Sequence, residues 1–364
     1  MPTLILSTCG TSLLTNLAGD QRGLVIRYAN VADSADVPYN DRNWLSELGA
    51  HAREQLRTAD VQQRERLSAE LNGLLRLYDG QLQRSRDNHW LVATDTWLGS
   101  MTAELLAEVL ETAGHVVEVK RITDLRTNDL GEFRAAMAEL ARLCAQDLRG
   151  MAAGGWRIVF NLTGGFKSVQ GFMQALGMLY ADESVYVFER TSQLLRLPKL
   201  PISLDADALV REHELVFRRL AFGLPVSVDA ATDLPETLIM EDDGFVTLSV
   251  WGDVVWNQAG PEFLAEQLWS PPDAKVRYGD RFAGSVDRCS RDELRMVNER
   301  IGDLARCLND TQYNPARLDF KLLRGHHAHY THECDAWAKG AAKRLFGHFG
   351  EGVFVVDRLG DALH

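Results

Sequence analysis

The chain has 364 residues, 46% of them hydrophobic, and carries a formal net charge of −12 at pH 7. This length is enough for two or three domains with cores of their own, and no run of about 18 apolar residues is present to predict a transmembrane helix. The N-terminal sequence lacks the basic start of a signal peptide and the five cysteines are scattered without a CxxC pair, so we expect a cytoplasmic protein without a cysteine-based zinc site.

The charge is unevenly distributed along the chain. Residues 275–364 carry 15 basic and 13 acidic residues, whereas residues 1–274 carry 24 basic and 38 acidic ones. Six of the ten histidines also fall within the last 39 residues. A tail this different from the rest of the chain predicts an anionic partner for the C-terminal region.

Strand and helix patterns alternate along the first 190 residues. Short apolar runs predict strands at 4–7, 89–93, 116–119, 157–160 and 184–188. Amphipathic spacing predicts helices at 41–58, 61–87, 101–113, 129–148 and 169–180. This alternation predicts an α/β domain over residues 1–195, in which helices cover both faces of a parallel sheet.

Pro198 and Pro201 mark a linker to a second region. Its pattern predicts a small winged-helix-like connector over residues 196–270, with helices at 206–222, 230–238 and 261–268, a turn at 241–244 and a strand at 245–251. Modules of this kind often bind DNA. The stretch 195–270 holds 13 acidic and 5 basic residues, however, which disfavours contact with phosphates.

Pro271 and Pro272 open the last region. Its pattern predicts a helix at 290–308 and strands at 276–286, 318–323, 329–334, 343–349 and 353–359. One helix against an antiparallel sheet is a compact α+β domain, here residues 271–364.

Polar loops follow three of the predicted strands in the first domain. Backbone N–H groups and helix N-termini in strand–loop–helix turns bind phosphate, so the loops predict one composite anion pocket at the carboxyl ends of the strands. The alternative is that these turns only connect strands to helices. The candidate ligand-binding residues are Thr8, Cys9, Gly10, Thr11, Ser12, Asp95, Thr96, Thr163, Gly164, Gly165, Phe166, Lys167 and Ser168.

Two of these loops, STCGTSLLTN (7–16) and NLTGGFKS (161–168), resemble the signature loops of CARF domains, the Rossmann-like sensors of type III CRISPR systems. The resemblance covers about residues 1–190. It implies a homodimer that binds one cyclic oligoadenylate, here cyclic tetra-adenylate, across its two-fold axis. Lys167 and Ser12 would contact phosphates and ribose hydroxyls, and residues 163–165 would lie under the ring. Some members of the family also cleave the ring.

The tail segment KLLRGHHAHYTH (321–332) gathers histidines and cations. Cleavage of RNA without a metal needs a base for the 2′-hydroxyl, cations for the developing phosphorane charge and an acid for the leaving oxygen, and histidine and arginine supply these roles. Strand alternation predicts Tyr330 and His332 on one face, and Arg358 in the last strand lies within reach of the same sheet. The alternatives are a metal site and a solvated polar edge strand.

The order of a helix, the sequence FKLLRG (320–325), a tyrosine-bearing strand and the sequence KRLFGHF (343–349) is similar to RelE-family mRNA interferases. The resemblance covers about residues 273–364 and implies a metal-independent endoribonuclease that cuts mRNA on the ribosome, with Arg344 as the central arginine. Thr331, His332 and Glu333 stand where the family has basic residues, so His329 or His332 would serve as base and His364 as acid. The candidate catalytic residues are Lys321, Arg324, His329, His332, Lys339, Arg344 and His364.

Taken together, the three regions resemble CRISPR-associated CARF–RelE mRNA interferases. The resemblance implies a cyclic tetra-adenylate-activated ribonuclease without a cofactor, whose partners are the bacterial ribosome and its mRNA. Two other functions remain open: a ligand-responsive transcriptional regulator that uses the winged helix, and a ring nuclease that degrades the cyclic oligoadenylate.

Overall fold

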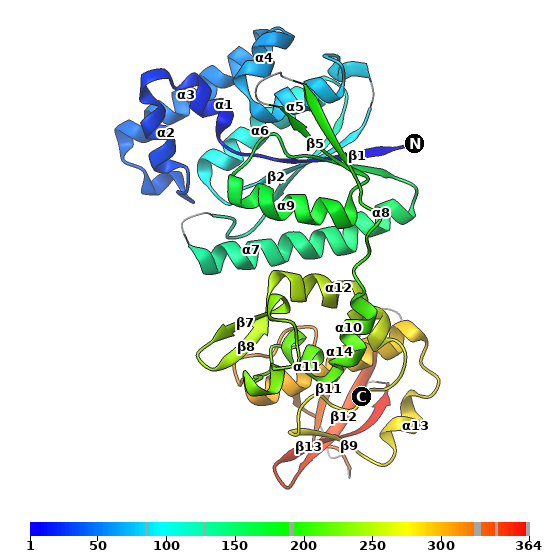
Figure 1. Ribbon diagram of the computed structural model, residues 1–364. Coiled ribbons are helices and arrows are strands. Elements are labelled where there is room, and N and C mark those ends of the chain that lie inside the picture. Colours follow the sequence, from blue (N-terminus) through cyan, green and yellow to red (C-terminus); the bar gives the residue numbers. More distant parts are fainter. Residues whose placement is uncertain (85, 127–128, 189–192, 324–328, 339–340, 362–364) are drawn as a thin grey trace. The chain divides into compact units, whose positions relative to one another are not determined.

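The computed structural model describes residues 1–84, 86–126, 129–188, 193–323, 329–338 and 341–361. The chain divides into two compact units, Met1–Leu204 and Asp205–His364 (Figure 1). No helix in the described part of the chain is both long enough and apolar enough to cross a membrane.

A six-stranded sheet forms the centre of the first unit. Its strands run in the order β3-β2-β1-β4-β5-β6, and all but the last are parallel. The bounds are β1 Thr3–Thr8, β2 Asn88–Ala93, β3 Val116–Arg121, β4 Arg157–Asn161, β5 Glu183–Val187 and β6 Leu194–Pro198. The prediction of a parallel sheet is confirmed. The antiparallel strand β6 was not predicted, and it extends the sheet past residue 195.

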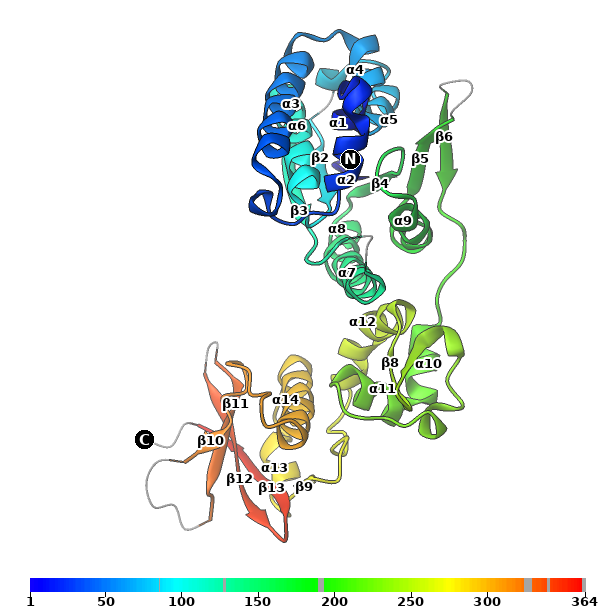
Figure 2. The same ribbon diagram turned by 90° about the vertical axis from the view of Figure 1, so that its left-hand side faces the viewer.

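Helices cover both faces of this sheet, as the prediction required (Figure 2). One face carries α1 Ser12–Leu17, α2 Arg22–Tyr28, α3 Tyr39–Thr58, α4 Val61–Leu67, α5 Ala69–Leu77 and α6 Trp97–Thr112. The other carries α7 Leu130–Leu143, α8 Arg149–Ala153 and α9 Lys167–Tyr180. The turns are η1 Gly19–Gln21, η2 Ser34–Asp36, η3 Leu82–Arg84 and the π-helical η4 Cys144–Leu148.

The helix predicted over 61–87 is interrupted at Ser68. This residue has an extended backbone with φ −137° and ψ 131°, and its hydroxyl accepts the Leu71 N–H, so it caps a new helix, α5. The break turns the first residues of α5 toward the carboxyl end of β1, because Ser12 Oγ accepts the N–H of Ala69 at 3.1 Å.

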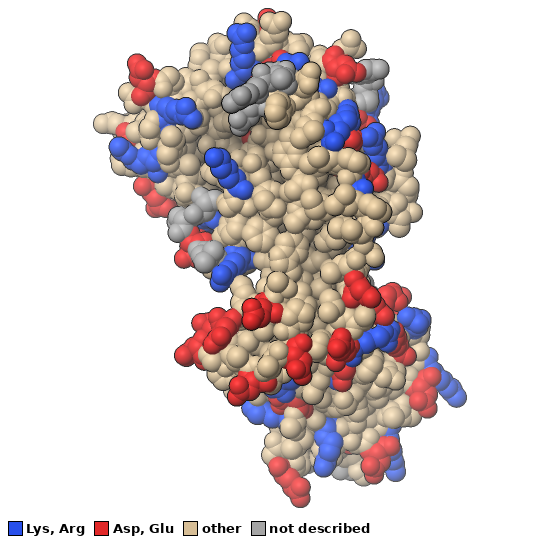
Figure 3. Space-filling model, viewed as in Figure 1, with Lys and Arg blue, Asp and Glu red and all other residues tan. Residues whose placement is uncertain are grey.

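The first part of the second unit contains three helices and a hairpin. They are α10 Ala206–Glu212, α11 Glu214–Ala221, β7 Ile239–Asp242, β8 Phe245–Leu248 and α12 Val250–Leu264, with turns η5 Asp229–Ala231 and η6 Glu236–Leu238. The predicted helix at 230–238 is therefore two short turns, and α12 starts well before the predicted 261–268 and passes through Pro261. Figure 3 shows acidic side chains over the hairpin and the neighbouring helices.

The second part is a five-stranded sheet with two helices on one face (Figure 2). Its order is β10-β11-β12-β13-β9, antiparallel except that β9 runs parallel to β13. The bounds are β9 Val276–Tyr278, α13 Phe282–Val286, α14 Arg291–Asn309, β10 Lys321–Leu322, β11 His332–Trp337, β12 Lys343–Gly350 and β13 Val353–Gly360. The strand predicted over 276–286 is wrong in its second half, which is α13 and buries Phe282 and Val286 in the core.

The two parts of the second unit are joined by buried hydrogen bonds. Asn298 in α14 donates to the carbonyls of Leu264 and Gln267 at 2.7 and 2.8 Å and accepts the Trp269 N–H at 3.0 Å. Arg218 in α11 is 2% exposed and donates to the Ser270 carbonyl at 2.6 Å. These bonds fix the segment that connects α12 to β9.

Candidate functional site

The two glycine-bearing loops meet at the centre of the first sheet. Strands β1 and β4 are neighbours, and the chain continues from them toward opposite edges, which makes their carboxyl ends the topological switch point where open α/β sheets bind ligands. Thr8 Oγ1 donates to the Gly164 carbonyl at 2.6 Å. Gly165 has a φ of +98°, and a Cβ there would lie 2.9 Å from Thr8 Oγ1, so glycine is required for this approach. The glycines thus serve the contact between the two loops.

A buried carboxylate that sequence analysis missed lies between these loops. Glu70, in the first turn of α5, is 0% exposed. One carboxylate oxygen accepts the Gly10 N–H at 2.9 Å, and the other accepts the hydroxyls of Ser12 and Ser68, both at 2.7 Å. Gly164 lies so close that a Cβ there would be 2.2 Å from Oε1. Two donors expected to bind a phosphate are therefore occupied by an anion of the protein itself.

The loop after β4 is fixed by Asn161 at the end of that strand. The Asn161 amide donates to Ser7 Oγ at 3.2 Å and to the Glu70 carbonyl at 3.1 Å, and its oxygen accepts the Thr163 N–H at 3.4 Å. Thr163 Oγ1 accepts the Val187 N–H at 3.3 Å, which leaves the hydroxyl proton of Thr163 for another acceptor. The loop is thus held in one conformation by groups on both sides.

The outer rim of the two loops carries polar groups with fewer internal contacts. Lys167 begins α9, is exposed and forms no ion pair with another described residue, and Ser168 beside it is also exposed. Phe166 and Thr11 precede α9 and α1, and neither helix start has a side-chain cap. Cys9, in contrast, is buried, and burial followed by the charge of Glu70 raises the pKa of its thiol. The rim therefore offers one cation and two helix starts to an anion.

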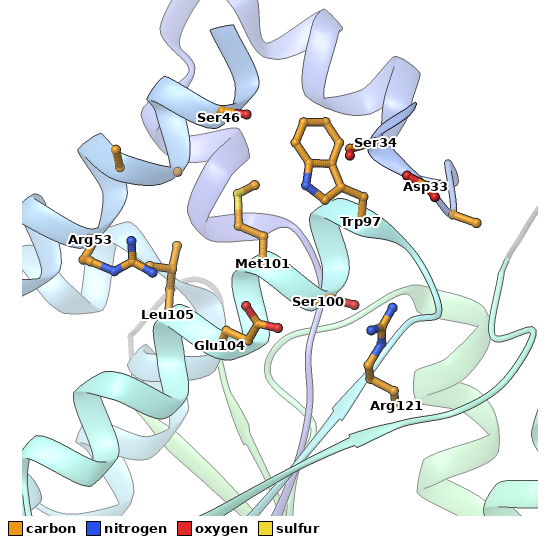
Figure 4. A pocket seen from close by; sticks show the side chains of 13 residues that line it. Asp33, Ser34, Ser46, Arg53, Trp97, Ser100, Met101, Glu104, Leu105 and Arg121 are labelled. Carbon is orange, nitrogen blue, oxygen red and sulfur yellow. The ribbon is translucent and has the colours of Figure 1, made fainter. Parts of the chain in front are cut away.

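The third predicted loop borders a different cavity. Thr96 is buried and caps α6 by accepting the Gly99 N–H at 3.1 Å, and Asp95 pairs with Arg121 and Arg126 at 3.6 and 3.5 Å. A pocket of about 460 Å³ opens beside them between α3 and α6. Figure 4 shows Trp97, Met101 and Arg121 among its lining residues. Asp95 and Thr96 do not line this pocket themselves, but Trp97, which follows Thr96, and Arg121, which pairs with Asp95, do.

In the second unit, Arg344 lies on the sheet face opposite α14. Cys334 and Leu345 belong to the core packed against α14, and strand alternation places Glu333, Asp335 and Arg344 on the other face. Arg344 donates to Glu333 at 2.6 Å and pairs with Asp335 at 3.1 Å. The carboxylate of Glu333 raises the pKa of Arg344, so the predicted central arginine is a fully charged group held by two carboxylates.

Tyr330 and His332 do not share a face, contrary to the prediction. Strand β11 begins at His332, so Tyr330 lies before it and outside its alternation. The Tyr330 ring contacts Phe346, with centroids 5.7 Å apart, whereas His332 stacks on Phe320 at 5.2 Å and meets Phe354 edge-on. Burial among these rings lowers the pKa of His332.

Of the other predicted catalytic residues, Lys321 and His329 lie within the described part of the chain. Lys321 pairs with Asp319, and the His329 ring lies 6.4 Å from that of Tyr330. Arg324, Lys339 and His364 lie outside the described residues, as do His326 and His327. Within the described ranges, no three His, Cys, Asp or Glu side chains are grouped so that they could hold a metal ion.

A histidine–carboxylate pair on β12 and β13 was missed at the sequence level. His348 Nδ1 lies 2.6 Å from Asp357 Oδ2, and both side chains are partly exposed. The residues are nine positions apart, and nothing in the pattern of the last two strands predicts their contact.

Comparison with known families finds a match over part of the first unit. Residues 65–200 match the family model of a CRISPR-associated protein (Cas_APE2256). The matched stretch runs from α4 past β6 and includes Glu70 and the loop after β4. No curated protein matches the chain. Over this stretch the chain is therefore similar to a CRISPR-associated family.

Proposed function

We propose, from this similarity to a CRISPR-associated family, that the protein is a ribonuclease of type III CRISPR defence that a cyclic oligoadenylate activates. Residues 1–204 bind cyclic tetra-adenylate, and residues 205–364 cleave ribosome-associated mRNA. The observation that carries the proposal is the meeting of the loops after β1 and β4 at the switch point, beside the exposed Lys167.

The sensor ligand lies over the rim of the two loops in this proposal. Lys167 favours phosphate groups by its charge, and the starts of α1 and α9, which have no side-chain cap, favour them by their helix dipoles. The Thr163 hydroxyl retains a proton for the ligand. Two copies of the chain complete the site, because one ring spans the two-fold axis of a homodimer in the CARF proteins that the loops resemble.

The effector surface is the sheet face that carries Arg344. Tyr330, Phe346 and Arg358 accompany it, since Arg358 is the register partner of Phe346 and the Tyr330 ring contacts Phe346. A guanidinium next to an aromatic surface suits an RNA phosphate with its base. The pairing of Arg344 with Glu333 and Asp335 supports a latent nuclease, because a phosphate must replace these carboxylates before Arg344 can stabilise a transition state.

The ligand activates only if it binds the active arrangement of the effector units more tightly than the latent one. The predominance of acidic residues in residues 195–270 opposes binding of free RNA in the absence of ligand. This acidity, together with the pairing of Arg344 with two carboxylates, favours low ribonuclease activity in uninfected cells.

The test is mRNA cleavage in a purified bacterial translation system, with cyclic tetra-adenylate, with cyclic hexa-adenylate, or without either. Cleavage of ribosome-bound mRNA only with the tetra-adenylate ring supports sensor, effector and coupling together. Loss of the ring without mRNA cleavage would instead make the protein a ring nuclease. If the protein instead retards promoter DNA in a gel-shift assay only when the ligand is present, and cleaves no mRNA, it is a transcriptional regulator.

A further inference from the structure

The pocket of about 460 Å³ between α3 and α6 is separate from the proposed sensor rim. Its lining comes from η2, α3, α6 and the end of β3, and none of the described residues that line it belongs to the loops after β1 and β4. Sites for small molecules typically enclose about 300–1,000 Å³. The pocket is therefore large enough for one small molecule.

One side of the pocket is closed by the packing of α3 against α6. A Cβ at Gly49 in α3 would lie 2.5 Å from Met101 Sδ in α6, so glycine is needed for this approach. Leu105, one turn further along α6, is buried in the core of the first unit. The pocket is thus formed by elements that the core holds in place before any ligand binds.

The Trp97 indole supplies a flat aromatic surface. Trp97 is the first residue of α6, and its backbone N–H donates to the Val31 carbonyl at 2.9 Å, which fixes the start of this helix. The side chain packs against the core but remains partly exposed to the pocket (Figure 4). A partly exposed tryptophan ring can bind a nucleobase by stacking.

Two donor groups near the end of β3 lack an acceptor. Ser100 is 8% exposed, and its hydroxyl forms no hydrogen bond with a described residue. Figure 4 shows this hydroxyl directed toward Arg121. The Arg121 side chain is 52% exposed and lies 3.6 Å from Asp95, beyond hydrogen-bond distance. Because an unpaired buried hydroxyl is unfavourable, an anionic acceptor between Ser100 and Arg121 would satisfy both groups.

The other charged groups of the lining distinguish a nucleotide from a simple anion. Arg53 donates to Glu108 through Nε at 2.8 Å and Nη2 at 2.9 Å, so its charge is already paired. Asp33 and Glu104 are exposed carboxylates in the lining, and they can accept ribose hydroxyls or the amino group of a base. The pocket thus offers a ring for stacking, donors for an anion and acceptors for O–H and N–H groups.

We propose that this pocket binds a free nucleoside monophosphate. The base stacks on Trp97, and the phosphate accepts hydrogen bonds from Ser100 and Arg121. This site goes beyond the proposed ribonuclease function and does not depend on it. A nucleotide unit of the cyclic oligoadenylate offers similar chemistry, so the experiment must separate the two ligands.

The experiment is isothermal titration of the full chain with AMP, GMP, CMP and UMP, one at a time. The mononucleotide that binds most tightly should bind at least about tenfold more tightly than its nucleoside or ribose 5-phosphate, because each of these lacks one of the two contacts. Trp97→Leu and Arg121→Gln should each weaken its binding by about tenfold or more. If none of the four binds at millimolar concentration, or if ribose 5-phosphate binds equally well, this inference is wrong.

Ser100→Ala separates loss of binding from loss of folding. Removal of an unpaired buried hydroxyl should leave the unfolding midpoint at or above that of wild type, while mononucleotide affinity falls by about three- to tenfold. Arg57→Gln is the matched control for Arg121→Gln, since Arg57 is an exposed arginine of α3 that pairs with Glu54 at 2.8 Å and does not line the pocket. This control should bind the mononucleotide as wild type does.

The variants Arg121→Gln and Lys167→Ala distinguish the pocket from the sensor rim. Arg121→Gln should retain its affinity for cyclic tetra-adenylate, and Lys167→Ala should retain its affinity for the mononucleotide. If instead Lys167→Ala loses the mononucleotide and Arg121→Gln keeps it, the nucleotide binds at the rim, and this inference is wrong while the proposed function stands. If wild type binds the mononucleotide in the pocket but cleaves no mRNA under any condition, the proposed function is wrong and this inference stands.

Discussion

The Ser12 hydroxyl donates to one oxygen of the Glu70 carboxylate at 2.7 Å, while the N–H of Gly10 donates to the other at 2.9 Å. The loop after β1 is thereby tied to the first turn of α5. Because Glu70 is fully buried, a ligand phosphate cannot reach these donors while the carboxylate remains in place. We expect the ligand to lie over the outer rim of the loops, where Lys167 is exposed.

Glu70→Ala should lower both stability and ligand affinity. The substitution removes the acceptor of the buried Gly10 N–H and Ser68 hydroxyl and of the partly buried Ser12 hydroxyl, which costs about 2–4 kcal/mol of the free energy of unfolding. Denaturant unfolding measures the first effect. Glu65→Gln is the control, because Glu65 pairs with Arg76 at 2.6 Å and touches neither loop.

A double-mutant cycle on ligand affinity tests whether Glu70 acts through Ser12. Ser12→Ala and Glu70→Gln should be non-additive in cyclic tetra-adenylate binding, because each removes the same hydrogen bond. Lys167→Ala and Glu70→Gln should be additive. Additivity in both cycles would show that the Ser12–Glu70 bond has no part in binding.

Lys167→Ala should weaken cyclic tetra-adenylate binding by about 10- to 100-fold, the loss expected for one charged phosphate contact. The unfolding free energy should stay within about 0.5 kcal/mol of wild type, because the side chain is exposed. Isothermal titration at two salt concentrations is the measurement. If Lys167→Ala binds cyclic tetra-adenylate with wild-type affinity and an unchanged salt dependence, Lys167 is not part of the binding site.

Glu333→Gln should raise cleavage in the absence of ligand, and Arg344→Ala should abolish it with ligand. The first change removes one of the two charges that hold Arg344, so a phosphate competes for the guanidinium more easily, by roughly tenfold. Arg344→Ala should cost about 10²-fold or more. The readout is mRNA cleavage in the translation system. Unchanged basal cleavage in folded Glu333→Gln would mean that this pairing does not restrain the nuclease.

The stability of the first unit should fall as the pH drops below about 6.5, the ordinary value for histidine. Burial, followed by the neighbouring His115, lowers the pKa of His89 to about 3. Between these values the unfolded chain binds a proton that the folded chain excludes, so the unfolding free energy declines by about 1.4 kcal/mol per pH unit. Chemical denaturation between pH 7 and 5 measures the slope, and His89→Gln should reduce it. An equal slope in that variant would contradict the assignment.

The sheet of the first unit and the meeting of its two loops could be predicted from sequence. Apolar runs followed by glycine-bearing polar loops indicate strand ends, and parallel strands present those ends at one edge. Glu70 could not be predicted as part of the site. An acidic residue in a first helical turn is common, and only the break at Ser68 turns it toward the loops.

In the second unit, prediction from sequence is limited by strand register. The last two strands were predicted to within one residue of their observed bounds, whereas the strand predicted at 329–334 is observed three residues later, as β11. The pairing of His348 with Asp357 depends on a bulge, and the separation of Tyr330 from His332 depends on where β11 begins. A shift of one residue exchanges the faces of a strand, so sequence periodicity alone cannot fix which side chains accompany Arg344.

The hydrogen bonds of Asn298 determine where the protein can be divided for experiments. A cut between residues 270 and 271 would separate this buried amide from the Leu264 and Gln267 carbonyls and from the Trp269 N–H. It would also leave the indole of Trp269, stacked on Phe263 at 4.1 Å, on the other fragment from α14. A fragment that begins before Asp205 keeps these partners in one piece, and expression trials of the C-terminal half should start there.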